Sequence, residues 1–182
     1  MMKTYQLSAA GRRNVMLLMI GAGLIWIFAI WTFQSTLAIS YSGDKILDSL
    51  KGVFAQGLTV DRTVPALFML VLMVAAPLTI WNVAMEWVVR YTPTGDGLHY
   101  DAFGISLVIP WSNISDIRVI DADSDEPSHE LRLKIDPTAQ ISNPVLRLLH
   151  VQAYGRVVLP VYAGIEHREE LIDEIRRRAN LN

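Results

Sequence analysis

The sequence predicts an α+β membrane protein in which a two-helix transmembrane hairpin precedes an antiparallel β-domain closed by a C-terminal helix. Two long uncharged segments, residues 14–43 and 63–85, predict the hairpin. Each exceeds the roughly 20 residues that a helix needs to cross a hydrocarbon core of about 30 Å. Beyond residue 86 the apolar residues alternate with polar ones, which is the period of half-buried β-strands.

The composition favours a membrane-embedded chain. The 182 residues are 52% hydrophobic and 19% charged, whereas soluble domains carry about 25% charged residues. As buried core helices, two uncharged runs of this length would need a far larger soluble shell than this chain provides. The first run is also too long for the apolar part of a cleavable signal peptide, so we expect a retained anchor.

The chain divides into a basic cytoplasmic tail at residues 1–13, a transmembrane hairpin at 14–89 and a β-domain at 90–182. We expect the two spans at about 15–39 and 65–88. Pro77 lies inside the second span and is expected to kink it, because proline cannot donate a helical hydrogen bond.

Basic and aromatic residues predict how the hairpin is oriented. Arg12, Arg13 and Arg90 flank one face of the hairpin, whereas the basic residues of the connecting loop are balanced by acidic ones. Because basic residues favour the cytoplasmic side, both termini are expected there. Trp81 and Trp87 lie toward the end of the second span, as expected of interfacial anchors.

The connecting loop carries a helical pattern at residues 44–58. One face of that helix is apolar and consists of Ile46, Leu47, Leu50, Val53 and Phe54. The simplest interpretation is a short helix lying on the membrane surface. The alternative is a helix pressed against a partner subunit, in which case Ile46, Leu50, Val53 and Phe54 are candidate partner contacts.

Charge and cysteine content exclude several classes of function. Residues 86–182 carry 10 Lys and Arg against 15 Asp and Glu, a net charge of −5, which opposes nucleic-acid binding. The chain has no cysteine, which excludes disulfides, Cys-ligated zinc and thiol catalysis.

Alternating apolar residues predict six or seven short, mostly antiparallel strands in the β-domain. The alternating sets are Leu98 and Tyr100; Ile105, Leu107 and Ile109; Leu131, Leu133 and Ile135; Leu149, Val151 and Ala153; and Val157, Leu159 and Val161. A helix is expected over residues 166–180, with acidic residues in its first turns and arginines in its last. Leu171, Ile172 and Ile175 form its apolar stripe.

Two short segments carry a family resemblance. Residues 91–98 (YTPTGDGL) and 109–117 (IPWSNISDI) resemble the opening strand–turn–strand and the most recognisable signature of bacterial pleckstrin-homology-like (PH-like) membrane proteins. The resemblance extends from residue 86 to the C-terminus. It implies a PH-like antiparallel β-barrel or sandwich capped by the terminal helix, without common catalytic residues. Some members of the family are assembly factors for membrane complexes.

Phosphoinositide binding is not expected, although the PH-like resemblance suggests it. That function requires a basic cluster in the first strand–turn–strand, and residues 92–97 contain no Lys or Arg. The net negative charge of the domain also opposes binding to an anionic leaflet.

No catalytic, metal or cofactor site is expected, and hence no enzyme. The four histidines are scattered, and His167 with Glu170 lacks a third ligand of suitable spacing. No Ser/His/Asp arrangement and no H-E-x-x-H pattern occurs. Trp111 follows a proline at an expected strand end. It is either an exposed anchor for a partner or a core residue packed under the C-terminal helix.

These observations predict a non-catalytic accessory or assembly subunit of a larger bacterial membrane complex, whose partners are other membrane protein subunits. We expect a multi-pass protein of the cytoplasmic (inner) membrane. The alternative is a free-standing membrane-anchored PH-like module that senses lipid, peptide or envelope state.

Overall fold

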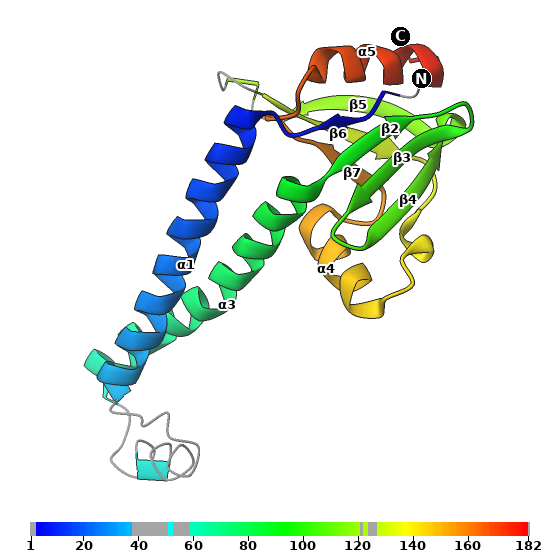
Figure 1. The fold of residues 1–182 in the computed structure, drawn as a ribbon. Coiled ribbons are helices and arrows are strands. Elements are labelled where there is room, and N and C mark those ends of the chain that lie inside the picture. Colours follow the sequence, from blue (N-terminus) through cyan, green and yellow to red (C-terminus); the bar gives the residue numbers. More distant parts are fainter. Residues whose placement is uncertain (1–2, 38–50, 53–58, 121, 124–126, 182) are drawn as a thin grey trace. The chain divides into compact units, whose positions relative to one another are not determined.

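The computed structural model describes residues 3–37, 51–52, 59–120, 122–123 and 127–181. This part of the chain is a mixed α+β protein with two long apolar helices, two antiparallel sheets and a C-terminal helix (Figure 1). Its contacts divide it into a sheet unit, Met1–Val15 with Ala84–Asn182, and a hairpin unit, Met16–Val83. The sequence-based division differs, because it set residues 1–13 apart from the β-domain.

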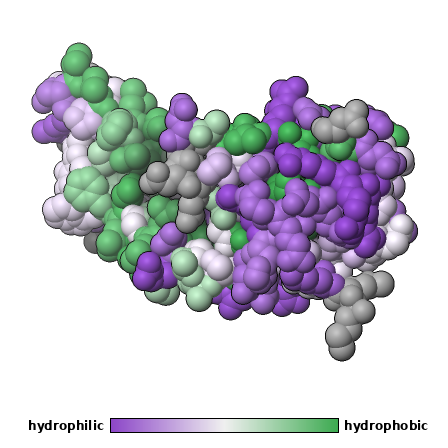
Figure 2. Space-filling model, turned by 90° about the horizontal axis from the view of Figure 1, so that it is seen from above, coloured by the Kyte–Doolittle hydropathy of each residue, from purple (hydrophilic) through white to green (hydrophobic). Residues whose placement is uncertain are grey.

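The hairpin unit contains most of α1 (Ala9–Leu37) and of α3 (Val60–Val88). Residues 9–15 of α1 and 84–88 of α3 belong to the sheet unit. Both helices are long and apolar enough to cross a membrane. Ser8 caps α1, since its Oγ accepts a hydrogen bond of 3.0 Å from the Gly11 amide. Figure 2 shows hydrophobic residues gathered over the helices and hydrophilic ones over much of the sheet unit.

Four alanines and one methionine are the buried apolar residues of the hairpin unit among the described residues. On α1, Ala22 and Ala29 are buried seven residues apart, and on α3 Ala66, Met69 and Ala76 are buried. Small side chains allow two helix backbones to approach closely in an apolar solvent, where van der Waals contact replaces the hydrophobic effect. The seven-residue spacing also keeps the buried residues on one side of each helix.

The first sheet has four antiparallel strands in the order β1-β2-β3-β4. They are β1 (Tyr5–Gln6), β2 (Arg90–Pro93), β3 (Gly97–Ala102) and β4 (Ile105–Pro110). Leu98 and Tyr100 pair with Ile109 and Leu107, and all four face the core, as their alternation predicts. The free edge of β4 is covered by the Gln140 side chain, which bonds both backbone groups of Val108.

The second sheet has three antiparallel strands in the order β5-β6-β7. They are β5 (Ile114–Ile120), β6 (Ser128–Leu133) and β7 (Val158–Val161). Short 3-10 turns, η1 (Trp111–Asn113) and η2 (Thr138–Gln140), follow β4 and β6. In the described residues the sheets do not join into a closed barrel, one of the two forms that the sequence analysis expected.

The strand expected at Leu149, Val151 and Ala153 is wrong, because these residues lie in helix α4 (Pro144–Tyr154). Asn143 caps α4 by accepting hydrogen bonds from two backbone amides of its first turn, and Pro144 has the backbone angle that starts a helix. Capping therefore outweighed an alternation that also fits a helix. Ile135 is likewise not a core residue, since its side chain is 70% exposed beyond the end of β6.

The C-terminal helix is confirmed as α5 (Arg168–Ala179). Its stripe of Leu171, Ile172 and Ile175 is fully buried. Figure 1 shows α5 lying across one side of the sheet unit and α4 on the opposite side. The core of the unit therefore lies between the two sheets and is closed by helices on both sides.

Candidate functional site

Both ends of the helical hairpin are fastened to the same sheet. Tyr5 pairs with Tyr91 and Gln6 with Arg90, so the strand that precedes α1 lies beside the strand that follows α3. The Gln6 carbonyl also accepts a hydrogen bond of 2.9 Å from the Glu166 amide. The Ser8 amide donates one of 2.9 Å to the Gly164 carbonyl. We call residues 5–8, with their partners in β2 and at 164–166, the clamp.

The clamp leaves little slack in either connection. Only Leu7 and Ser8 separate β1 from α1, and only Val89 separates α3 from β2. Leu7 and Val89 are both buried in the sheet unit, as is Met85 in the last turn of α3. The side chains at both junctions are therefore core residues rather than parts of a flexible linker.

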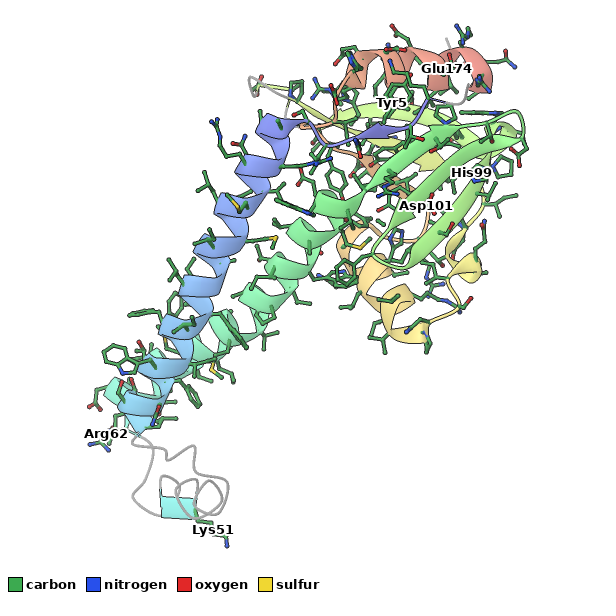
Figure 3. All side chains as sticks on the ribbon, viewed as in Figure 1. Tyr5, Lys51, Arg62, His99, Asp101 and Glu174 are labelled. Carbon is green, nitrogen blue, oxygen red and sulfur yellow. The ribbon has the colours of Figure 1, made fainter. Side chains whose placement is uncertain are left out.

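A polar cleft of about 280 Å³ lies beside the clamp, between β1, the β2–β3 turn and α5. Figure 3 shows Tyr5 and Glu174 on the same side of the unit. The cleft is lined by Lys3, Tyr5, Pro93, Thr94, Gly95, Glu170, Glu174 and Arg178.

The charged groups of the cleft neutralise one another. Lys3 forms an ion pair with Glu170, and Arg178 Nε donates to Glu174 Oε1. The hydrogen bond from Lys3 lowers the pKa of Glu170, and that from Arg178 lowers the pKa of Glu174. Both carboxylates are consequently ionised at neutral pH and already partnered.

Acid–base chemistry is a poor match for this cleft. A general acid or base works best with a pKa near the operating pH. Burial, together with the hydrogen bond that its hydroxyl donates to Glu170, raises the pKa of Tyr5 to about 12. The pKa values of the Glu170 and Glu174 carboxylates are lowered, so they also lie away from neutral pH. Lys3 and Tyr5 contact Glu170 of α5, and Arg178 of α5 contacts the Thr94 carbonyl. We call these five residues, which join β1 and the β2–β3 turn to α5, the latch.

Trp111 lies beside this latch, half-buried and in contact with α5. Its indole Nε1 donates a hydrogen bond of 3.1 Å to the Thr94 carbonyl. Arg178 of α5 donates to the same carbonyl at 2.5 Å, and its guanidinium lies 5.5 Å from the centre of the Trp111 ring. The indole is thus held within its own domain by a hydrogen bond and a cation–π contact. Its role as a partner contact stays a prediction.

The residues expected at the membrane interface are distributed over both units. Arg12 and Arg13 are exposed in the first turns of α1, and Arg90 is exposed at the start of β2. Trp87 lies in the last turn of α3, and these four residues belong to the sheet unit. Trp81 belongs to the hairpin unit.

The expected loop helix at 44–58 falls almost entirely outside the described residues. Ile46, Leu50, Val53 and Phe54 are among the residues that are not described. The structure therefore leaves these candidate contacts as predictions.

A buried aromatic cluster lies in the interior of the sheet unit. It is a chain of ring contacts with centroid separations of 5.2 to 6.4 Å, formed by Tyr91, Tyr100, His150, Tyr154 and Tyr162. The hydroxyls of Tyr154 and Tyr162 share a hydrogen bond of 2.5 Å, and the Tyr91 hydroxyl donates to the Pro160 carbonyl at 2.6 Å. This cluster joins α4 to both sheets.

His150 is the ionisable base within the cluster. Its side chain is buried, and its Nδ1 atom has no hydrogen-bond partner among the described residues. Burial lowers the pKa of His150, so the imidazole is neutral. The ring contact of His150 with Tyr100 ties α4 to the first sheet.

The outer face of the first sheet is polar. A shallow depression of about 470 Å³ there is lined by Thr92, Thr94, Gly95, Asp96, His99 and Asp101. Figure 3 shows His99 and Asp101, both of which lie on β3. Within the described residues, no group of three His, Asp or Glu side chains is placed to hold a metal ion.

The clamp and the latch were missed by sequence reasoning. β1 is only two residues long, so it has no measurable periodicity. Its alternation, with Tyr5 and Leu7 buried on either side of an exposed Gln6, was the only available signal. No family model, no curated protein and no solved structure matches this chain.

Proposed function

We propose that this protein is a non-catalytic accessory or assembly subunit of a larger bacterial membrane complex. In this proposal α1 and α3 span the cytoplasmic membrane and both termini lie in the cytoplasm. The sheet unit is a PH-like domain presented at the membrane surface. The partners are other membrane protein subunits.

The observation that carries the proposal is the clamp. A tether needs one connection, whereas this sheet unit holds both ends of a two-helix hairpin through β1–β2 pairing and buried junction residues. Short, buried connections restrict the orientation of a domain relative to the elements that enter it. Restricted placement is useful to a subunit that must meet fixed neighbours and has little value for a free module.

The exposed surface of the hairpin supports partner binding in the membrane. Large apolar side chains are exposed along both helices, including Leu24, Ile27 and Trp31 on α1 and Leu67, Phe68 and Val71 on α3. Lipid or another helix can cover such a surface. The PH-like assignment is supported by antiparallel sheets followed by a capping helix, together with the I-P-W segment at the β4–η1 junction.

The test is a chimera in which residues 16–83 are replaced by an unrelated two-span hairpin of equal helix lengths. Residues 1–15 must be kept, since they belong to the sheet unit. After gentle-detergent purification and quantitative mass spectrometry, we expect the membrane proteins that accompany the native chain to be lost. A second chimera that replaces only residues 44–58 measures how much of this partner binding depends on the loop.

The control is the thermal unfolding of the sheet unit, which must be the same in the chimera and the native chain. Full recovery of the same partners with the foreign hairpin would contradict the proposal. In that case the membrane segment would be only a tether.

A further inference from the structure

Exposed apolar side chains gather at one end of the sheet unit. Phe103, at the tip of the β3–β4 hairpin, is 53% exposed. On α4, Val145 is 62% and Leu148 is 68% exposed. Solitary exposed apolar residues are ordinary on protein surfaces, but several from neighbouring elements indicate a surface that is covered in use.

The two elements are neighbours. A Cβ atom at Gly104, the residue after Phe103, would lie 3.6 Å from Cδ1 of Leu146 in the first turns of α4. Figure 1 shows α4 beside the β3–β4 end of the first sheet. We call Phe103, Val145 and Leu148 the apolar tip.

The strand register places the apolar tip at the end of the sheet where α3 enters. Arg90 opens β2 directly after α3 and pairs with Asp101. The β3–β4 turn at Phe103 and Gly104 follows Asp101 within three residues, so it lies at the Arg90 end of the sheet. The opposite end carries the β2–β3 turn and the latch.

The backbone at Phe103 is strained. Its φ of 43° and that of 79° at Gly104 are left-handed, as in the two-residue hairpin turn in which both central residues have positive φ. Asn, Asp and Gly are preferred at the first of these positions, and a bulky side chain there is an outlier. A strained aromatic residue at an exposed turn indicates a role for its side chain.

The helix α4 has apolar residues on both faces. Leu146, His150 and Tyr154 are spaced four apart and turn toward the sheets, with His150 and Tyr154 in the aromatic cluster. Val145 and Leu148 lie on the opposite face. Folding of the sheet unit accounts for the first face only, so the second face needs an occupant.

We propose that the apolar tip docks into the boundary between headgroups and acyl chains of the bilayer that α1 and α3 span. This inference rests on the proposed membrane insertion of the hairpin. A bilayer surface is the occupant that the connectivity supplies, because an apolar helix of spanning length ends two residues before Arg90. A helix that lies in this boundary buries its apolar face without crossing.

Membrane docking gives the sheet unit a further support besides its two connections to the hairpin. The attraction is apolar rather than ionic, so it agrees with the net negative charge of residues 86–182 and does not require anionic lipid. Docking would fix the tilt of the domain, which the accessory function needs.

Depth-dependent fluorescence quenching tests the docking. The chain has no cysteine, so single cysteines can carry an environment-sensitive dye without background labelling. Leu148→Cys reports the apolar tip, and Leu24→Cys reports the proposed span. Asp173→Cys on α5, whose native side chain is 77% exposed, is the water-facing control. The full-length protein is placed in nanodiscs of uncharged phosphatidylcholine.

Nitroxide groups on the lipid acyl chains should quench the dye at position 148 as well as at position 24, and an aqueous quencher should act mainly at position 173. If position 148 behaves like position 173 while position 24 is lipid-quenched, docking is wrong and the proposed membrane insertion stands. If position 24 is also water-exposed, the membrane insertion fails and docking fails with it.

A second variant separates docking from folding. Phe103→Asn introduces a residue that the turn prefers, so the sheet unit should unfold at the same or a higher temperature. With a dye at Val145→Cys, the same substitution should reduce lipid quenching and increase aqueous quenching. Unchanged quenching at position 145 would show that Phe103 does not contact the bilayer and would overturn its place in the tip. If the dye at position 148 is protected from the aqueous quencher only when a co-purified protein is present, the apolar tip binds a protein partner instead of the bilayer.

Discussion

The indole Nε1 of Trp26 on α1 donates a hydrogen bond of 3.2 Å to the carbonyl oxygen of Met73 on α3. In a regular helix that carbonyl would accept from the amide four residues later, but position 77 is a proline and has no N–H. Trp26 therefore satisfies the backbone group that Pro77 leaves without a helical partner. In lipid such a group has no water to bond, so the neighbouring helix is the available source of a donor.

This relationship predicts an energetic coupling between Trp26 and Pro77. Trp26→Phe should destabilise the hairpin by about 0.6 kcal/mol, the average for interhelical hydrogen bonds in membranes, and by at most about 1.7 kcal/mol. In a Pro77→Ala background the helical amide returns, so the same substitution should cost much less. Unfolding in mixed micelles with increasing denaturing detergent measures the loss of stability caused by Trp26→Phe in each background.

Trp31→Phe is the matched control, since Trp31 is an exposed tryptophan on the same helix. An equal loss of stability from Trp26→Phe in the two backgrounds would show that the hydrogen bond to Met73 is not linked to Pro77.

Acid should weaken the sheet unit through its buried histidines. Burial lowers the folded-state pKa of both His129 and His150 below the usual 6.5. Below pH 6.5 the unfolded chain therefore binds more protons than the folded one. Stability is fully present above pH 6.5 and is lost as the pH falls toward the folded pKa values, by up to about 1.4 kcal/mol per pH unit for each histidine.

His150→Phe should reduce this acid sensitivity, because phenylalanine keeps the ring contacts with Tyr100 and Tyr154 but cannot take up a proton. Thermal unfolding between pH 7.5 and 5 measures the effect, with His167→Asn on the exposed start of α5 as the control. If the His150→Phe protein retained the full pH slope, the buried imidazole would not be its source.

Sequence patterns predicted the parts of this fold in which one face of an element is buried over several residues. Leu98 and Tyr100, or Leu171 and Ile175, repeat at the period of their element and were placed correctly. The strand prediction at Leu149, Val151 and Ala153 was wrong because a short apolar alternation also fits a helix. The Asn143–Pro144 cap was the deciding local signal.

The clamp and the latch could not be predicted in this way, because they depend on contacts between distant parts of the chain. Thr94, Trp111 and Arg178 meet only after the β2–β3 turn, η1 and α5 have folded together. The seven-residue spacing of Ala22 and Ala29 is visible in the sequence, but alanine is too common in apolar helices to mark the buried face by itself.

The orientation of the chain predicts opposite labelling at its loop and its C-terminus. Arg12, Arg13 and Arg90 favour a cytoplasmic sheet unit. Single cysteines at Ser42 and Asn182, in a chain without natural cysteines, should therefore react differently with a membrane-impermeant maleimide. In intact cells we expect labelling at position 42 only, and after permeabilisation at both positions. Labelling of position 182 alone in intact cells would reverse the orientation.

The last prediction concerns Gly11, where the start of α1 meets the clamp. A Cβ atom at this position would lie 2.7 Å from the Gly164 carbonyl oxygen and 3.1 Å from the Gly164 Cα. Backbone atoms cannot rotate away as the end of a side chain can, so Gly11→Ala must push α1 from the 164–166 segment. We expect a loss of about 1–3 kcal/mol in the stability of the sheet unit, the usual cost of overpacking.

Gly21 and Gly23 supply the matched controls, because a Cβ atom at either position would have no neighbour within 4 Å among the described residues. Alanine there should be neutral or should favour the helix, by up to about 1 kcal/mol. If the clamp restricts domain placement, Gly11→Ala should also increase the amplitude of domain motion, measured as a broader distance distribution between spin labels at positions 24 and 173. Native-like stability and an unchanged distribution in Gly11→Ala would show that the contact between α1 and Gly164 does not hold the domain, and the clamp would then reduce to the β1–β2 pairing alone.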